Sequence, residues 1–191
     1  MRTDVIEAFP RVAVPLDGRR AAAIAIVVSG DDSVVWLTRR ASGMRAHPGQ
    51  FALPSGRVDP GEDAIGAALR ELEEELGVVA ERADCVGLLD DYPTRSGYVI
   101  TPVVVRLPGP ARLRPNPEEV AHVHEIGVRE LAVEPRFLTI PESDRPVIQL
   151  PLVGHLVHAP TAAVLYQFRE AALYGRTTRV AHFEQPVFAW R

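Results

Sequence analysis

Three glutamates in one short stretch are the residues of this sequence best suited to chemistry. Glu71, Glu74 and Glu75 are spaced i, i+3 and i+4, so on a helix they would share one face. Like charges at this spacing repel one another by about a few tenths of a kcal/mol per pair. A hard divalent cation that prefers oxygen ligands, Mg²⁺ or Mn²⁺, would offset that repulsion. The alternative is an acidic helix face that only meets water.

The residues around these glutamates predict the helix that must carry them. Asp63 is suited to the N-cap, because its carboxylate can accept from the free N–H groups of the first turn. Gly77 follows the last turn, where a left-handed C-cap costs glycine least. Apolar residues recur between them with helical spacing, at Ile65, Ala68, Leu69, Leu72 and Leu76. We therefore predict a helix over Asp63–Leu76 with one face buried.

Fixed spacing extends beyond the helix to nine positions in the stretch Gly56–Val78. The pattern is Gly-x5-Glu-x7-Arg-Glu-aliphatic-x-Glu-Glu-x-Gly-aliphatic, and it also includes Glu62, Arg70 and Gly77. The stretch resembles the Nudix box, and the chain is therefore similar to the Nudix hydrolases.

The resemblance implies both a fold and a division of labour. The implied fold is α/β, a Nudix-type α/β/α sandwich with a mixed β-sheet; alternation of strands and helices alone would favour only α/β or α+β. It implies a cofactor, Mg²⁺ or Mn²⁺, held by Glu71, Glu74 and Glu75. It also implies that Arg70, together with Glu62, is structural and holds the box carboxylates in position.

The segment before the box carries a second resemblance. A Nudix subgroup, the coenzyme A pyrophosphatases, has the pattern Leu-Thr-x-Arg-(Ser/Ala)-x3-Arg-x3-Gly-x3-Phe-Pro-Gly-Gly. Eight positions match it here: Leu37, Thr38, Arg40, Ala41, Arg45, Gly49, Pro54 and Gly56. Two positions depart from it. Leu53 replaces the phenylalanine, and Ser55 replaces a glycine, which would be strained if the backbone there required positive φ.

This segment predicts a phosphate-binding loop. Arg40 and Arg45 precede the proposed metal helix, and the planar arginine fork suits phosphate oxygens. We expect them to bind substrate with Gly56, and on coenzyme A to contact its 3′-phosphate. The alternative is that both arginines are surface cations. His47 is expected to be a hydrogen-bonding loop residue.

One further carboxylate is expected after the box. Nudix enzymes often draw an acid from a loop at about the place of Glu119, which the resemblance makes a metal ligand or base; otherwise it is a solvated loop acid. The residues leave the general base open among Glu71, Glu74, Glu75 and Glu119. The run Ser96–Val103 also matches the subgroup, so the resemblance covers about residues 20–173.

Periodicity predicts the remaining elements. Expected strands are Ala21–Val28, Val34–Thr38, Gln50–Pro54, Ala83–Leu89, Tyr98–Leu107, Ala121–Val128, Phe137–Ile140 and Val147–Val157. Expected helices are Asp4–Phe9, Val128–Val133 and Thr161–Leu173. Pro102 indicates a bulge or a sheet edge, because proline has no N–H to donate. The tail, 175–191, has no assigned counterpart.

Composition bounds the class of protein. The 191 residues suit one domain, 1–191, and 47% hydrophobic residues exclude a disordered chain. A net charge of −4 without a long basic run argues against nucleic acid as a partner. No apolar run reaches the length of a membrane span, and the first residues lack the long apolar run of a signal peptide, so we expect no membrane partner. One cysteine, Cys85, fits a reducing cytoplasm. Homodimers are frequent in the family, so a homodimer is compatible with these features.

The expected activity is therefore that of a metal-dependent pyrophosphohydrolase acting on a small-molecule nucleotide. Coenzyme A or an acyl derivative is the first choice of substrate, with 3′,5′-ADP and 4′-phosphopantetheine as products. The nearest alternatives are ADP-ribose, a dinucleotide or a nucleoside triphosphate. An alternative of another class is a non-catalytic nucleotide-sensing module, although such modules often lose box acids that this chain keeps.

Overall fold

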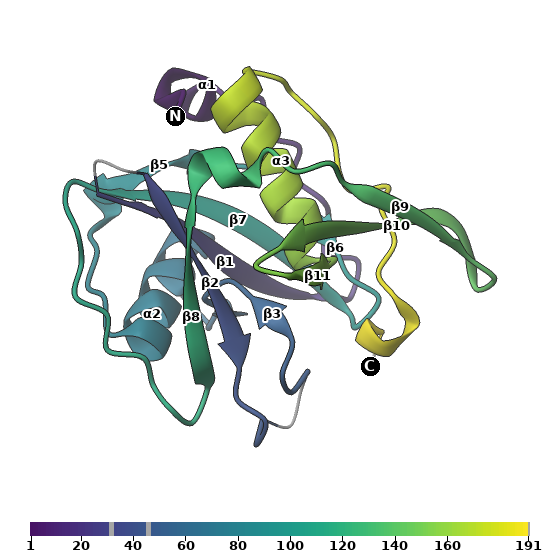
Figure 1. The fold of residues 1–191 in the computed structure, drawn as a ribbon, viewed down its shortest axis with the longest axis horizontal. Coiled ribbons are helices and arrows are strands. Elements are labelled where there is room, and N and C mark those ends of the chain that lie inside the picture. The colour runs from purple at the N-terminus through teal and green to yellow at the C-terminus, as the bar shows by residue number, and fades with distance from the viewer. Residues whose placement is uncertain (31–32, 45–46, 191) are drawn as a thin grey trace.

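The computed structural model describes residues 1–30, 33–44 and 47–190, and its centre is a mixed eight-stranded sheet (Figure 1). The strands of this first sheet are β1 (Arg20–Ser29), β2 (Val34–Arg40), β3 (Phe51–Ala52), β4 (Ser55–Arg57), β5 (Cys85–Leu88), β6 (Tyr92–Pro93), β7 (Tyr98–Leu107) and β8 (Val120–Gly127). β1 and β7 pair in parallel along ten residues, and the other pairings are antiparallel. The expected mixed sheet is confirmed.

Alternation along β1 divides the core between the two faces of this sheet. Ala23, Ala25 and Val27 pack on the side of α2 (Ala64–Leu76), whereas Ile24 and its alternate neighbours pack on the side of α3 (Thr161–Tyr174). α1 (Thr3–Glu7) packs beside α3 on that second face. Helices therefore cover both faces, as the sandwich prediction requires (Figure 1).

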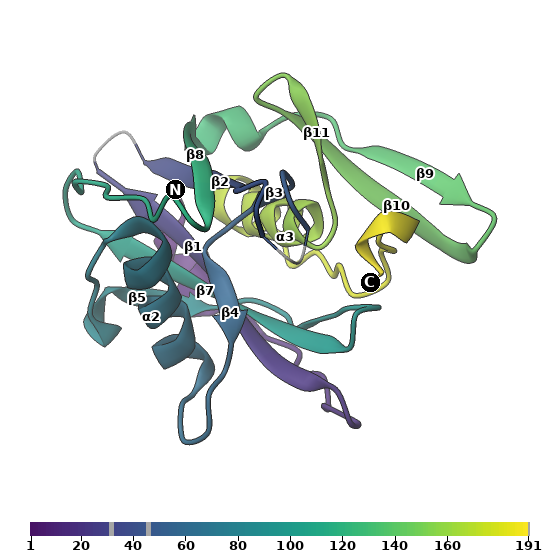
Figure 2. The same cartoon turned by 90° about the horizontal axis from the view of Figure 1, so that it is seen from below.

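A second, three-stranded sheet stands beside α3. It contains β9 (Arg136–Ile140), β10 (Ser143–Leu152) and β11 (His155–His158) in the order β11-β10-β9 (Figure 2). The prediction of one strand over Val147–Val157 is wrong. Val153 and Gly154 both have positive φ, at 47° and 76°, so the chain turns there and forms a hairpin. A β-branched residue is a poor signal for such a turn, which is why the pattern concealed it.

The prediction that Pro102 marks a sheet edge is also wrong. β7 lies between β1 on one side and β5 and β6 on the other. β6 pairs with β7 at Val99 and Ile100, and β5 begins its pairing at Val103, so Pro102 falls in the gap between those two partners. Ile24 of β1 pairs with Pro102 on the other side of β7, but neither β5 nor β6 pairs with it, so a missing N–H on that side leaves no strand partner unsatisfied.

The sheet opens between β1 and β2. β1 pairs with β2 only at Val28 and Ser29, near its C-terminal end. Nearer the start of β1 the partner is β4, which pairs with Ala22, Ala23 and Ile24. β2 instead continues with β3 and β8. The opening brings the end of β2, β3 and β4 to one side of the molecule, below the second sheet (Figure 2).

The ends of the chain are fixed by ion pairs to buried carboxylates. Asp91, 3% exposed, accepts from Arg11 and from Val14 N, and Asp90 accepts from Arg179.

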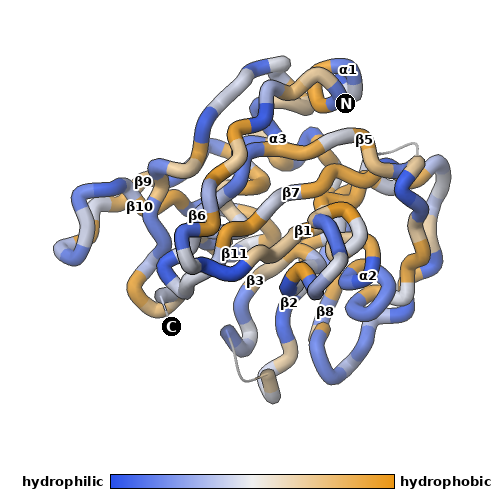
Figure 3. Tube along the Cα trace, turned by 180° about the vertical axis from the view of Figure 1, so that it is seen from behind, coloured by the Kyte–Doolittle hydropathy of each residue, from blue (hydrophilic) through white to orange (hydrophobic). Residues whose placement is uncertain are grey.

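Figure 3 shows the apolar strands β1 and β7 enclosed by more polar loops. No helix in the described part of the chain is long and apolar enough to cross a membrane.

Candidate active site

The helix that carries the glutamates forms as the sequence predicts. The Asp63 carboxylate accepts from Gly66 N at 2.8 Å, and Gly77 ends the helix in the left-handed conformation at φ 64°. Leu72 and Leu76 are fully buried against the first sheet. The side chains on the flank beside β4 are thereby held at fixed positions next to that strand.

The three box glutamates of α2 lie in different surroundings. Glu75 is 2% exposed, and its Oε1 accepts from Ser55 N at 3.0 Å. Glu71 lies against β4 so closely that a β-carbon on Gly56 would fall 1.8 Å from Glu71 Oε1. The side chain of Glu74, in contrast, is 54% exposed. The carboxylates of Glu71 and Glu75 therefore face β4, and that of Glu74 lies at the solvent-exposed edge of the cluster.

Arg70 connects the acids to one another. It makes two hydrogen bonds to Glu62, one to Glu71 at 2.7 Å and one to Glu74 at 3.1 Å. It also donates to the Arg57 carbonyl, which ties the cluster to β4. This is the geometry of a residue that positions the box carboxylates.

Burial changes the acidity of the two inner glutamates. Burial raises the pKa of Glu75 to about 7, against the Ser55 hydrogen bond and the charge of Arg40, which lower it. Burial also raises the pKa of Glu71, although Arg70 acts in the opposite direction. The negative charge of Glu119 adds a smaller contribution to both increases.

Glu119 is held in place by the loop before β8. Asn116 Nδ2 donates to Glu119 Oε1 at 3.3 Å, and Asn116 N donates to the carbonyl of Glu75 at 2.9 Å. The Glu119 carbonyl accepts from Ala41 N at 2.8 Å, next to Arg40. The loop thus joins the end of α2 to the end of β2.

The donor set fits a hard divalent cation. Glu71, Glu75 and Glu119 offer carboxylate oxygens, and a cation among them would offset the mutual repulsion that adds to the effect of burial on the pKa values of Glu71 and Glu75. In the described conformation, no three His, Cys, Asp or Glu side chains already converge on one metal position. Glu71 and Glu74 point instead toward Arg70. Binding therefore requires side-chain rotation within a cluster that the backbone has already assembled.

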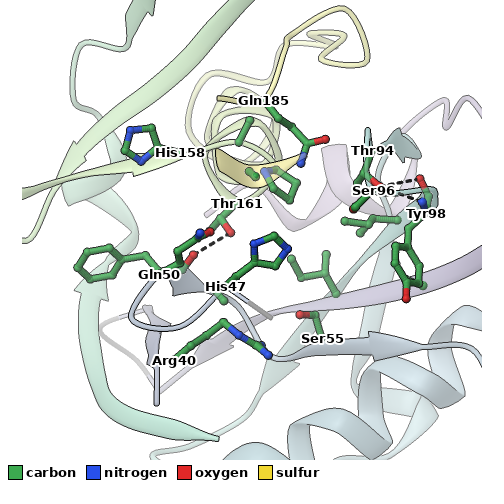
Figure 4. Close-up of a pocket in the computed structure, with 18 of the residues that line it drawn as sticks. Arg40, His47, Gln50, Ser55, Thr94, Ser96, Tyr98, His158, Thr161 and Gln185 are labelled. Atoms are coloured by element: carbon green, nitrogen blue, oxygen red, sulfur yellow. Dashed lines mark hydrogen bonds between the residues drawn. The ribbon is translucent and has the colours of Figure 1, made fainter. Parts of the chain in front are cut away.

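A large cavity of about 1350 Å³ opens beside these acids (Figure 4). Glu71, Gly56 and Ser55 line one end of it, and Arg40 and His47 lie nearby. Ser55 is not among the described residues with positive φ, so serine is not strained at the position where the subgroup has glycine. Arg45 lies outside the described residues.

Comparison with known proteins identifies the group to which this arrangement belongs. A model of the NUDIX domain matches residues 18–150. The chain belongs to the Nudix family. Hydrolases of this family act on small nucleotide substrates and generally use divalent metal ions.

Similar proteins agree with this assignment. The chain is 36% identical over 115 residues to an uncharacterized Nudix hydrolase NudL from Photorhabdus laumondii, covering 60% of this chain and 62% of that protein. It is 39% identical over 113 residues to NudL from Yersinia pestis, covering 59% and 57%. The chain thus spans about six tenths of the length of these curated relatives.

Two solved structures share the fold. A binary complex of a C. elegans Ap4A hydrolase matches with a TM-score of 0.54 at 18% identity, covering 81% of this chain and 99% of that chain. A Nudix hydrolase from Nitrosomonas europaea matches with a TM-score of 0.54 at 17% identity, covering 88% and 78%.

The far side of the Nudix cavity comes from residues that the sequence left unassigned. Gln185, Phe188 and Ala189 of the tail line it, together with His158 at the end of β11. Phe183, Phe188 and Trp190 are aromatic residues of this tail, and their clustering is a local signal that the tail has a packing role.

Proposed function

We propose that this Nudix hydrolase is a metal-dependent pyrophosphohydrolase of coenzyme A and acyl-coenzyme A. Its products would be 3′,5′-ADP and (acyl-)4′-phosphopantetheine. The observation that carries the proposal is that the subgroup pattern and the box meet in one cavity. Arg40, Gly49 and Gly56 of that pattern line the same cavity as Glu71.

The proposed ligands of the divalent ion are Glu71 and Glu75, with Glu74 at the exposed edge of the cluster, which leaves Glu119 free to accept a proton. When bound, such an ion neutralises diphosphate charge and lowers the pKa of a coordinated water. Arg70 holds Glu71, and Ser55 N holds Glu75. These contacts hold the two inner carboxylates beside β4.

Glu119 is the proposed general base. Glu71 and Glu75 are engaged by Arg70 and Ser55, whereas the half-buried Glu119 accepts from the weaker donor of the Asn116 amide at 3.3 Å. In this step, water forms a bond to one phosphorus while the bridging P–O bond breaks. The water proton passes to the Glu119 carboxylate, and the bridging oxygen leaves with the other phosphate.

Arg40 is proposed to bind the diphosphate. The sequence pattern suggested the 3′-phosphate, but the positive charge of Arg40 acts on Glu75 and on His47, at the carboxylate end of the cavity. A guanidinium beside the metal-binding acids is better placed for the scissile group than for a distant phosphate.

A product-resolved substrate screen with Mg²⁺ tests the proposal. Coenzyme A, acetyl-coenzyme A, dephospho-coenzyme A, ADP-ribose, a diadenosine polyphosphate and nucleoside triphosphates would each be incubated with wild-type protein and with Glu75→Gln. We expect 3′,5′-ADP from the coenzyme A substrates, and loss of that product on exhaustive chelation. Efficient cleavage of ADP-ribose or a triphosphate, with coenzyme A left intact, would refute coenzyme A as the substrate. Activity that survives chelation would refute the metal dependence. No cleavage of any of these compounds would favour a sensing module.

A further inference from the structure

The cavity has two walls of different charge. Four arginines of the described residues line it, and all four come from strands of the first sheet: Arg20 of β1, Arg39 and Arg40 of β2, and Arg57 of β4. The opposite wall is built from the β10–β11 turn, β11, the start of α3 and the tail. Among the described residues that line this second wall, none is Arg, Lys, Asp or Glu. Figure 4 shows Arg40 and Ser55 across the cavity from His158 and Gln185.

The second wall is apolar with a few neutral hydrogen-bonding groups. Its apolar members are Pro151, Leu156, Ala159, Pro160, Phe188 and Ala189. Gln185 and Thr161 add an amide and a hydroxyl. The two histidines of this wall are His155 and His158, and burial lowers the pKa of His158, which favours its uncharged form.

The tail is fixed firmly enough to serve as a wall. Glu184, 2% exposed, pairs with Arg95 at 2.5 Å, and Gln185 Oε1 accepts from Arg95 N at 2.7 Å. Trp190 lies with its ring 5.0 Å from the same guanidinium, and its Nε1 donates to the Gln185 carbonyl. Tyr92 Oη donates to the Phe183 carbonyl at 2.9 Å. The tail is thus tied to the β6–β7 loop of the first sheet.

The side chain of Phe188 projects from this tail and is not buried in it. Its side chain lines the cavity, yet the residue is 54% exposed. Its ring meets the His158 ring edge-on, with centroids 5.2 Å apart and planes at 82°. His158 is itself held by Gln149, 6% exposed, at 2.8 Å. Two rings in fixed positions therefore present aromatic surface to whatever enters this side of the cavity.

We propose that this C-terminal wall binds the uncharged arm of the substrate, a pantetheine-type chain of amides and apolar carbons, with Phe188 as a specificity-determining residue. The proposal rests on the proposed function, because it needs a diphosphate whose two arms differ in charge. A phosphate placed against this wall would be desolvated without a cation, whereas the first sheet offers four arginines. The phosphate-bearing nucleotide therefore lies toward the arginines. The neutral arm takes the other side, where Gln185 and His158 place polar atoms beside the apolar residues of the wall.

The size of the cavity agrees with this division. Pockets for small ligands commonly hold about 300–1,000 Å³. The cavity of about 1350 Å³ exceeds that range, so it has room for a second arm in addition to a nucleotide.

Binding measured by calorimetry without metal tests the proposal on the intact chain. The ligands are coenzyme A and 3′,5′-ADP, which has the nucleotide but lacks the neutral arm. The proteins are wild type, Phe188→Ala and the control Val187→Ala. Val187 is 41% exposed on the same tail segment but is not among the described cavity-lining residues. Thermal melts would verify that both variants are folded.

We expect wild type to bind coenzyme A more tightly than 3′,5′-ADP. Phe188→Ala should weaken the affinity for coenzyme A by about 5- to 30-fold and change the affinity for 3′,5′-ADP by less than about twofold. The reason is that the truncation removes an aromatic contact that only the neutral arm makes. Val187→Ala should change neither affinity. Equal weakening of both ligands, weakening of 3′,5′-ADP alone, or no weakening at all would overturn the proposal.

Failure of this inference is distinguishable from failure of the proposed function. If wild type hydrolyses coenzyme A but Phe188→Ala leaves the ratio of the two affinities unchanged, the wall assignment alone is wrong. If wild type neither hydrolyses coenzyme A nor binds it more tightly than 3′,5′-ADP, the substrate is wrong and the wall assignment falls with it.

Discussion

Replacing Gly56 by alanine should damage catalysis while sparing the fold. A β-carbon at residue 56 would lie 1.8 Å from Glu71 Oε1, whereas ordinary contact begins at 3.4 Å. The carboxylate must therefore retreat by about 1.6 Å, which is the difference between 3.4 Å and 1.8 Å. Glu71 can do so because its carboxylate is the end of a flexible side chain and no backbone atom is among the three nearest neighbours.

The two effects of this substitution differ in size. Displacing a catalytic group by about 1 Å can cost about 10²-fold in rate, so we expect kcat/KM to fall by about that factor. Gly56 is not among the glycines with positive φ, so alanine fits the backbone. A compatible Gly→Ala change stabilises by about 0.4–1 kcal/mol through the unfolded chain. That gain offsets part of the cost of moving Glu71, and the free energy of unfolding should change by less than about 1 kcal/mol.

Steady-state hydrolysis of the best substrate, together with urea unfolding, measures both effects. Gly109→Ala is the matched control, because a β-carbon on Gly109 would meet no described atom within 4 Å and Gly109 is not among the positive-φ glycines. The control should change neither activity nor stability by more than a small amount. Wild-type kcat/KM in Gly56→Ala would show that the position of Glu71 is unimportant. A loss of several kcal/mol of stability would show that the backbone, and not the side chain, gives way.

Three further predictions follow from the surroundings of single residues. Glu75→Gln should lower kcat by about 10²–10³-fold because the amide keeps the shape but loses the metal-binding charge, whereas Glu74→Gln should cost less than about tenfold because the side chain is 54% exposed; equal losses would contradict this. Arg40→Ala should lower kcat/KM by about 10- to 150-fold on coenzyme A and dephospho-coenzyme A alike. A loss confined to coenzyme A would show that Arg40 binds the 3′-phosphate and not the diphosphate. Burial acts to raise the pKa of Glu184, but Arg95 and other donors outweigh it and hold the pKa at about 2. The stability from this depressed pKa is full above the ordinary carboxylate pKa and is lost as pH falls from about 5 toward 2, and allowing for the half-exposed guanidinium it amounts to about 2 kcal/mol. The difference in unfolding free energy between wild type and Glu184→Gln should therefore shrink from pH 7 to pH 3 in urea titrations, and a constant difference would contradict the ion pair.

Local patterns predicted the helix and its acids because each signal acts within a few residues. The Asp63 cap, the apolar stripe and Gly77 all lie inside one element, and the helix begins one residue after Asp63 and ends at Leu76, as expected. The same pattern could not state how far each acid is buried, since i, i+3 and i+4 spacing groups side chains without stating which of them β4 will cover, and Glu74 remains half-exposed.

Long-range contacts explain what the sequence left open. The tail is fixed by Glu184 pairing with Arg95, 89 positions away, and neither residue carries a local signal for the other. The hairpin at Val153 was concealed because its turn uses a residue type that rarely adopts positive φ.

The residues that local patterns predict and the residues that only long-range contacts bring together also have different proposed roles. The proposed cleavage depends on Glu71 and Glu75 on one helix and on the β4 backbone beside it, which a contiguous motif encodes. The neutral wall depends on segments that meet only when the second sheet and the tail fold back over the first sheet. The arm of the substrate that contacts Phe188 therefore contributes binding without entering the reaction, and a change in that wall should alter which diphosphate is accepted before it alters how the diphosphate is cleaved.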